Sequence, residues 1–332
     1  MNNTFENTPA LSALNKEKIH KAFSVNPNWT TNWSEFVSIS DHNFRDVLEL
    51  WFSDESRATQ VYGHISDWNV SAVTDLSHAF DSRTEFNEDI SNWDVSSVNN
   101  LSFMFYRASS FDQPIGEWNV SSVTTMYAAF AKATAFNANL GNWDVSSVGE
   151  MDYMFREASS FNQIINDWNV SKVTSMLQMF LKAESFNQPI GDWDVSSVND
   201  MSLMFGDTTN FNQSIGNWDL SNVEDIHGMF WKATAFDQEI GDWDVSNVTD
   251  MSGMFAYTSQ FTDDLNDWNI SNVTNMASMF EHCSIFDETL KDWNVDAVTN
   301  MNSMFKCAYR YNQDMYFWEP DACSDMDSMF EQ

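Results

Sequence analysis

Carboxylates recur beside a repeated tryptophan, and of all the side chains in this sequence they are the best suited to bind a cation. Aspartate stands on both sides of Trp193 and Trp243, and another follows Trp218. Hard cations such as calcium prefer oxygen ligands of this kind. The candidate calcium ligands are Asp192, Asp194, Asp219, Asp242 and Asp244. The alternative, which we favour, is a solvated acidic face, because stacked turns alone provide no chelating loop.

A serine stands three residues after most of these tryptophans, and serine can act as a nucleophile or as a helix cap. Two later units carry Asp296 and Asp321 at the same place. Aspartate cannot replace a nucleophilic hydroxyl, but both residue types are strong N-caps. The column therefore predicts the N-cap of a short helix in each unit and not a catalytic group.

The motifs of common enzymes are missing from the sequence. It contains no nucleophile elbow, phosphate-binding loop, zinc-protease helix or dinucleotide fingerprint. The 6 histidines share no place in the repeat, and the 3 cysteines form no metal-binding or disulfide framework. We therefore predict a protein that is not an enzyme and needs no cofactor, with calcium as the one exception to test.

Large aromatic residues at variable places in the repeat are candidates for binding a partner. Such side chains bury a large area at low entropic cost and are enriched in contact surfaces. The predicted binding residues are Phe103, Tyr106, Tyr127, Tyr153, Trp231 and Tyr257. The alternative is a set of isolated surface aromatics that need no functional explanation.

The elements that would position these side chains follow from a strict internal repeat. One column of tryptophans and one of phenylalanines recur every 25 residues without an insertion or deletion. The tryptophans are Trp68, Trp93, Trp118, Trp143, Trp168, Trp193, Trp218, Trp243, Trp268, Trp293 and Trp318. A fixed period of this kind indicates a solenoid in which each unit buries its apolar face on its neighbours.

Two apolar patterns alternate within one unit. Ile90, Trp93 and Val95 suggest a short strand, and the spacing of apolar residues from Val98 to Ala108 suggests a short helix. We therefore predict an α/β repeat solenoid, leucine-rich-repeat-like, with about eleven turns over residues 61–332. Residues 1–60 do not fit the repeat, and they predict a helical N-terminal cap, with one helix opening after Asp41 and another near residues 19–23.

The phrases FNQPIGDWDVSSVNDMSLMF (186–205) and FDQEIGDWDVSNVTDMSGMF (236–255) closely resemble the repeat of BspA-like surface proteins. The resemblance covers about residues 61–330. It implies a leucine-rich-repeat relative used for adhesion or protein contact, at a cell surface, secreted or on a virion, with no catalytic residues to transfer. The first residues of this chain show no secretion signal.

Charge narrows the choice of partners. The net charge of −34 repels phosphate backbones and anionic lipid headgroups, so we expect neither nucleic acid nor membrane insertion. A protein or glycan ligand fits better. The leading prediction is an adhesion or interaction module. The alternative is a structural component of a virion or envelope that self-associates end to end, because no C-terminal cap is visible in the last unit.

Overall fold

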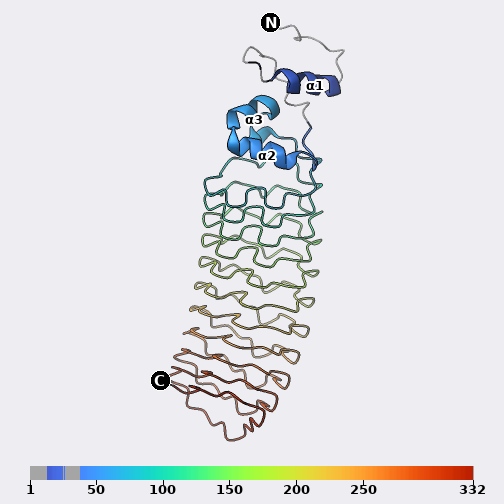
Figure 1. The fold of residues 1–332 in the computed structure, drawn as a ribbon. Helices are drawn as coiled ribbons and strands as arrows, with labels where there is room; N and C mark the ends of the chain where they lie inside the picture. Colours follow the sequence, from blue (N-terminus) through green and yellow to red (C-terminus); the bar gives the residue numbers. More distant parts are fainter. Residues whose placement is uncertain (1–12, 25, 27–37, 332) are drawn as a thin grey trace.

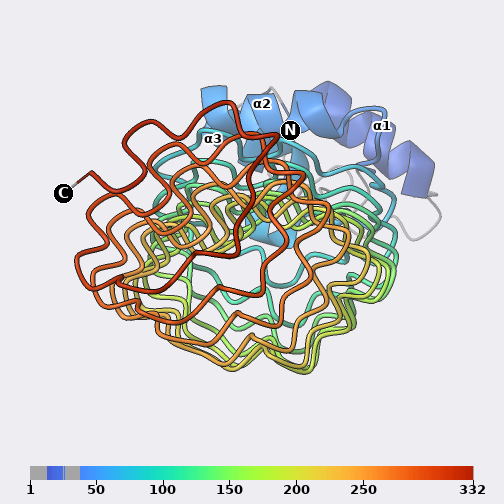
Figure 2. The same ribbon diagram turned by 90° about the horizontal axis from the view of Figure 1, so that it is seen from below.

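The computed structural model describes residues 13–24, 26 and 38–331, and the remainder of the predicted N-terminal cap lies outside these ranges. The described part begins with three helices, α1 (Ala13–Phe23), α2 (Phe44–Ser53) and α3 (Glu55–Tyr62), and a short 3-10 helix, η2 (Ile65–Asp67). From Trp68 onward the chain winds into similar turns stacked one on another, with α2 and α3 against one end (Figure 1). Seen from below, successive turns overlap with a gradual shift (Figure 2).

The interior of the stack is a set of apolar columns, as the repeat predicts. The indole of Trp93 is 3 % exposed, and Phe105 is buried with its ring centroid 5.4 Å from that of Phe130 in the next turn. From Trp93 onward, each indole N–H donates to a backbone carbonyl 28 residues earlier, for example from Trp93 to Ile65 at 2.8 Å. The tryptophan column therefore contributes both buried apolar area and hydrogen bonds that join neighbouring turns.

The predicted short helix at residues 98–108 is wrong. Phe103 has a φ of 57°, which no right-handed helix accommodates, and the described residues after Asp67 contain no helix. The segment is instead a chain of tight turns, in which the amide of Met104 donates to the carbonyl of Leu101 at 3.0 Å. Alternate amides bond between turns, as from Phe103 to the Tyr127 carbonyl at 2.8 Å. A helix would use these amides within one turn and leave the stack without its ladder.

The predicted strand around Trp93 is also absent. Parallel pairing occurs as single bridges farther along each turn, in one unbroken column from Asp75 through Asn100 to Asp325. Among the described residues, the array is therefore a solenoid of turns and isolated bridges rather than an α/β solenoid with a strand and a helix in every unit.

A second ladder lines one exterior edge. The side-chain oxygen of Asn137 accepts from the backbone amide of Asn162 at 2.9 Å, and Asn162 does the same for Asn187 at 3.0 Å. The glutamine that follows each Asn often donates to the same oxygen, as Gln188 does to Asn162 at 2.9 Å. These contacts satisfy backbone amides that would otherwise lack a partner, so this column is structural.

The helices before the array close its first turn. α2 begins at Phe44, as predicted, and its buried face includes Trp51, whose ring meets Trp68 edge-on at 5.8 Å. Asp41 does not cap this helix, because its carboxylate accepts from the amide and the hydroxyl of Thr74 at 2.8 and 2.7 Å. The α2 helix thus lies on the first turn as an N-terminal cap would, and α3 lies beside it (Figure 1).

Candidate functional site

The candidate calcium ligands are distributed along the array and do not form one ligand set. Asp194 accepts from the amide and the hydroxyl of Ser196 at 3.2 and 2.6 Å, and Asp244 accepts from the amide of Ser246 at 3.0 Å. Asp219 likewise accepts from the amide of Ser221. Asp192 and Asp242 lie exposed beside the tryptophans. Within the described ranges, no three acidic, histidine or cysteine side chains are placed to hold a metal ion.

The serine column does not cap helices as predicted, because the carboxylate or amide two residues earlier makes the turn. Asp94 accepts the amide of Ser96 at 3.1 Å and its hydroxyl at 2.6 Å. The hydroxyl bond, followed by the amide bond, lowers the pKa of Asp94, and serines have the same effect on Asp144 and Asp219. Asp296 can replace serine because its backbone amide alone donates to Asn294 at 2.9 Å.

Four aromatic rings from four successive turns form one continuous row on the exterior. His78 stacks on Phe103 with centroids 4.6 Å apart, Tyr127 follows at 5.1 Å and Tyr153 at a further 5.2 Å. His78 is exposed and the other three rings are partly exposed. Burial, with contributions from Tyr153 and Asp152, raises the pKa of the Tyr127 phenol. We call His78, Phe103, Tyr127 and Tyr153 the aromatic row.

The other predicted binding residues divide between this row and a separate cluster. Tyr106 meets Phe103 edge-on at 5.6 Å and extends the row sideways. Trp231 lies several turns farther along the array, where the ammonium of Lys232 lies 4.3 Å from its ring centroid and 5.8 Å from that of Tyr257. The sequence therefore identified most members of the aromatic row but not their continuity, and it missed His78.

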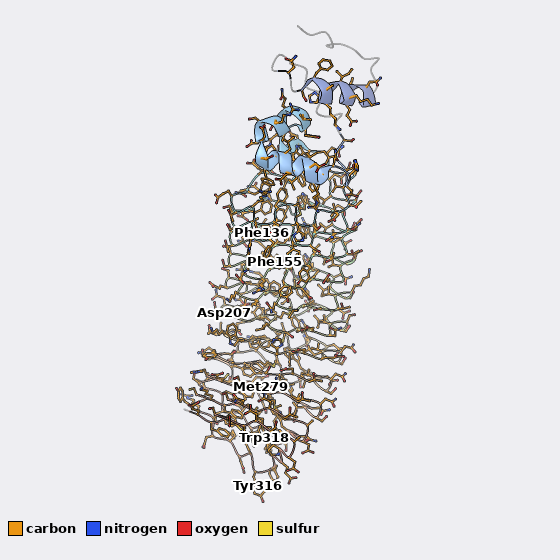
Figure 3. The ribbon with its side chains drawn as sticks, in the orientation of Figure 1. Phe136, Phe155, Asp207, Met279, Tyr316 and Trp318 are labelled. Carbon is orange, nitrogen blue, oxygen red and sulfur yellow. The ribbon has the colours of Figure 1, made fainter. Side chains whose placement is uncertain are left out.

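A group of basic side chains beside the aromatic row also escaped the sequence analysis. Of the chain's 15 lysines and arginines, six occupy two adjacent places in the repeat. These residues are Arg107, Lys132, Arg156, Lys182, Lys232 and Lys306. Asp207 belongs to the same edge, and Figure 3 places its side chain at the margin of the stack. Sorting the charged residues by repeat position would have revealed this edge, because acidic residues dominate elsewhere in the array.

The basic and aromatic side chains contact each other. The guanidinium of Arg107 lies 4.9 Å from the ring centroid of Tyr106, and that of Arg156 lies 5.8 Å from Tyr153. Glu157 forms ion pairs with Arg156 at 3.4 Å and with Lys132 at 3.6 Å. We call Arg107, Lys132, Arg156 and Lys182 the cation row. Along the four successive turns that carry it, the cation row gives an otherwise acidic molecule a local excess of positive charge.

A third exterior feature combines three carboxylates with a histidine. Asp200, Asp225 and Asp250 occupy successive turns at the bridge column, all partly buried. The His227 ring lies 3.1 Å from the carboxylate of Asp225, and this hydrogen bond is the main cause that raises the pKa of His227. Burial alone would raise the pKa of Asp225, but the hydrogen bonds from His227 and its charge outweigh that effect, so the pKa is lowered. Nothing in the sequence pointed to this pair, because the histidines share no repeat position.

The last described turn exposes apolar side chains that are buried or better covered in the other turns. Phe330 is 56 % exposed although its ring stacks on Phe305, and Met326 is 47 % exposed. Self-association through this turn stays a prediction. Among the described helices, none has the length and apolar character needed to cross a bilayer.

Comparison with known proteins places the chain in a family of undetermined activity. The DUF285 family, described as "Mycoplasma protein of unknown function", matches residues 47–167, 124–243, 157–268 and 234–332. The overlapping matches cover the last helices before the array and the array itself, as expected for a repeat. No curated protein and no solved structure matches the chain. Because the matched residues make up most of its length, the chain belongs to the DUF285 repeat family.

Proposed function

We propose that this protein is a non-catalytic interaction solenoid that binds a protein or glycan through its aromatic row. The observation that carries the proposal is the continuity of His78, Phe103, Tyr127 and Tyr153, whose centroids are spaced 4.6 to 5.2 Å apart on the exterior. Covering water-exposed aromatic rings with a partner is favourable, because it removes apolar surface from water. Core packing does not account for them, because other residues fill the apolar columns.

The repetition of the array supports a binding role over an enzymatic one. Each turn repeats the polar contacts of its neighbour, whereas a catalytic site needs an acid, base or nucleophile in a local environment of its own. The aromatic row is the kind of local departure from repetition that creates a specific contact surface. The similarity of the repeat to BspA-like surface proteins extends the proposal to adhesion at a cell surface, and the leucine-rich-repeat relationship is part of that proposal.

A binding array with two matched variants tests the proposal. Labelled protein would be applied to printed glycans and surface proteins as wild type, as a Phe103→Ser/Tyr127→Ser/Tyr153→Ser variant and as a Tyr309→Ser/Tyr316→Ser control. The control residues are exposed aromatics outside the row, with 62 % and 83 % of their surface accessible. We expect the row variant to lose the wild-type signals and the control to keep them. Signals that survive in a folded row variant, or no signal for the wild type, would refute the proposed function.

A further inference from the structure

The spacing of the aromatic row limits the shape of what can lie along it. Neighbouring centroids are 4.6, 5.1 and 5.2 Å apart. An α-helix places side chains of one face about 5.4 Å apart per turn. A β-strand places same-face side chains about 6.6 Å apart, so it would fall out of step with the rings within two or three contacts. The row therefore matches a helix that lies parallel to the axis of the stack.

The length of the row suits a short helical segment. Four rings spaced about 5 Å apart cover roughly 15 Å, the length of about ten helical residues. Such a helix would present one apolar side chain per turn, at spacings of three and four residues, to successive rings. Tyr106 meets Phe103 edge-on at 5.6 Å and widens the apolar surface on the side of the cation row.

The charges that border the row differ on its two sides. On one side lie Arg107 and Lys182, and no described acidic side chain is within ion-pair distance of either. Arg156 is on the same side, with Glu157 as its partner at 3.4 Å. The one described carboxylate on this side that contacts the row is that of Asp81, 2.9 Å from the His78 ring at the first turn. On the other side lies the bridge column with Glu150, which acts electrostatically on Tyr127 together with Asp152. A partner that complements both sides carries acidic residues along one border of its apolar face only.

We propose that the aromatic row and the cation row together bind an amphipathic helix of a partner protein whose acidic border faces Arg107 and Arg156. This inference rests on the proposed function and names the class of partner. The net charge of −34 opposes the approach of any acidic molecule, but salt screens that repulsion beyond about 8 Å at physiological ionic strength. The acidic residues of the partner must therefore lie close to the cations, where the local attraction is strongest.

Selection from a displayed library of random 15-residue peptides tests this pairing with the intact chain. We expect enriched peptides with apolar residues at helical spacing and with Asp or Glu on one border. Fluorescence anisotropy should show roughly tenfold weaker binding of these peptides to Tyr153→Ala and to Arg107→Glu. Trp231→Ala, which alters the separate cluster, should bind them as the wild type does. Circular dichroism of each variant confirms that it is folded.

Three results would overturn the inference. They are a library without enriched peptides, enriched peptides without the acidic border, and enriched peptides that bind the Tyr153→Ala variant as tightly as the wild type. None of these refutes the proposed function by itself, because the glycan and protein array measures dependence on the row without assuming a helical partner. If the array signals also survive loss of the row, both proposals fail.

Discussion

Each tryptophan of the array has two physical roles, and they explain why this residue recurs at a constant interval. Its ring fills the interior of the turn, and from Trp93 onward its indole N–H donates to the carbonyl of the residue 28 positions earlier. Trp168 donates to Leu140 at 3.0 Å, with the indole 3 % exposed. Phenylalanine could fill most of this volume but offers no donor, so the Leu140 carbonyl would keep only its bond from the Trp143 amide, at 3.1 Å, and the two turns would lose the bond that joins them.

Replacing Trp168 by phenylalanine should therefore destabilise the protein by about 2–4 kcal/mol, from the lost indole hydrogen bond and the lost ring volume. Trp318→Phe removes the same type of bond, to Leu290 at 2.9 Å, from a partly exposed position where water can replace the donor. We expect Trp318→Phe to lower the free energy of unfolding by less than half as much as Trp168→Phe. Urea denaturation of both variants measures the difference, and equal losses would show that the indole bond contributes little.

The pairing of His227 with Asp225 makes local stability depend on pH. The folded-state pKa of His227 is raised, chiefly by its hydrogen bond to Asp225, and Asp250 and Asp200 add to the effect. A raised pKa contributes stability that is fully present below the unfolded value of about 6.5 and is lost as the pH rises through the folded value. Asp225, whose pKa is lowered, loses its contribution only in strong acid, well below the pH at which His227 titrates.

His227→Gln should consequently lower the melting temperature more at pH 5.5 than at pH 8.5. The comparison is between wild type and variant at each pH, which cancels the titration of the other acidic residues. In an Asp225→Asn background, the same substitution should have nearly the same effect at both pH values, because the main partner of the imidazolium is gone. If His227→Gln lowers the melting temperature by the same amount at both pH values in the wild-type background, the assigned pairing is contradicted.

At the scale of the turn, left-handed backbone positions replace the expected helix. Phe103, Arg107 and their counterparts in other turns have φ between 51° and 65°, and only Gly228 and Gly253 meet this demand with glycine. Side chains other than glycine lose about 1–2 kcal/mol in this region. The ladder of amides between turns offsets that cost, because residues in this conformation donate to the next turn, as Phe103 and Arg107 do at 2.8 Å each.

Gly253→Ala measures this backbone cost directly. A Cβ at Gly253 would meet no atom within 4 Å, so the substitution adds strain without a clash. We expect a loss of about 1 kcal/mol in the free energy of unfolding. Gly149→Ala is the matched control, since its Cβ would make only an ordinary contact at 3.9 Å and its φ is not in the left-handed region. The control should be neutral or slightly stabilising, and equal effects in both would argue against the left-handed turn.

The repeat columns could be predicted from the sequence, whereas the turn geometry could not. Tryptophan and phenylalanine at constant spacing imply a shared interior in any stacked fold, and the Asn ladder follows from an amide at the same place in most turns. The apolar spacing of Val98, Leu101, Met104 and Ala108 resembles a helix because consecutive tight turns also advance by three or four residues. Residues such as Phe103 and Arg107 give no sign of a positive φ. The continuity of the aromatic row could not be predicted either, because Tyr127 occupies a different repeat place from Phe103 and Tyr153.

At the scale of the molecule, every turn meets its neighbours through nearly the same contacts, so stability is close to a sum over turns and their interfaces. One whole turn can therefore be removed without changing the type of contact between those that remain. Removal of residues 168–192 joins Asp167 to Trp193, which restores the local sequence around the tryptophan. The indole of Trp193 would then reach the carbonyl of Leu140, which Trp168 uses in the intact protein.

Excision of this one turn should leave a cooperatively folded protein, shorter by one repeat, that keeps the whole aromatic row and loses only Lys182 from the cation row. Small-angle scattering should report a decrease in the longest dimension of about 5 Å, the spacing of one turn. Excision of residues 168–187 is the control: it removes a similar length of chain but breaks the register of every column, and it should give an expanded or aggregated product. If both deletions fold equally well, the 25-residue register does not determine the stack, and the aligned tryptophan and phenylalanine columns are not what holds its turns together.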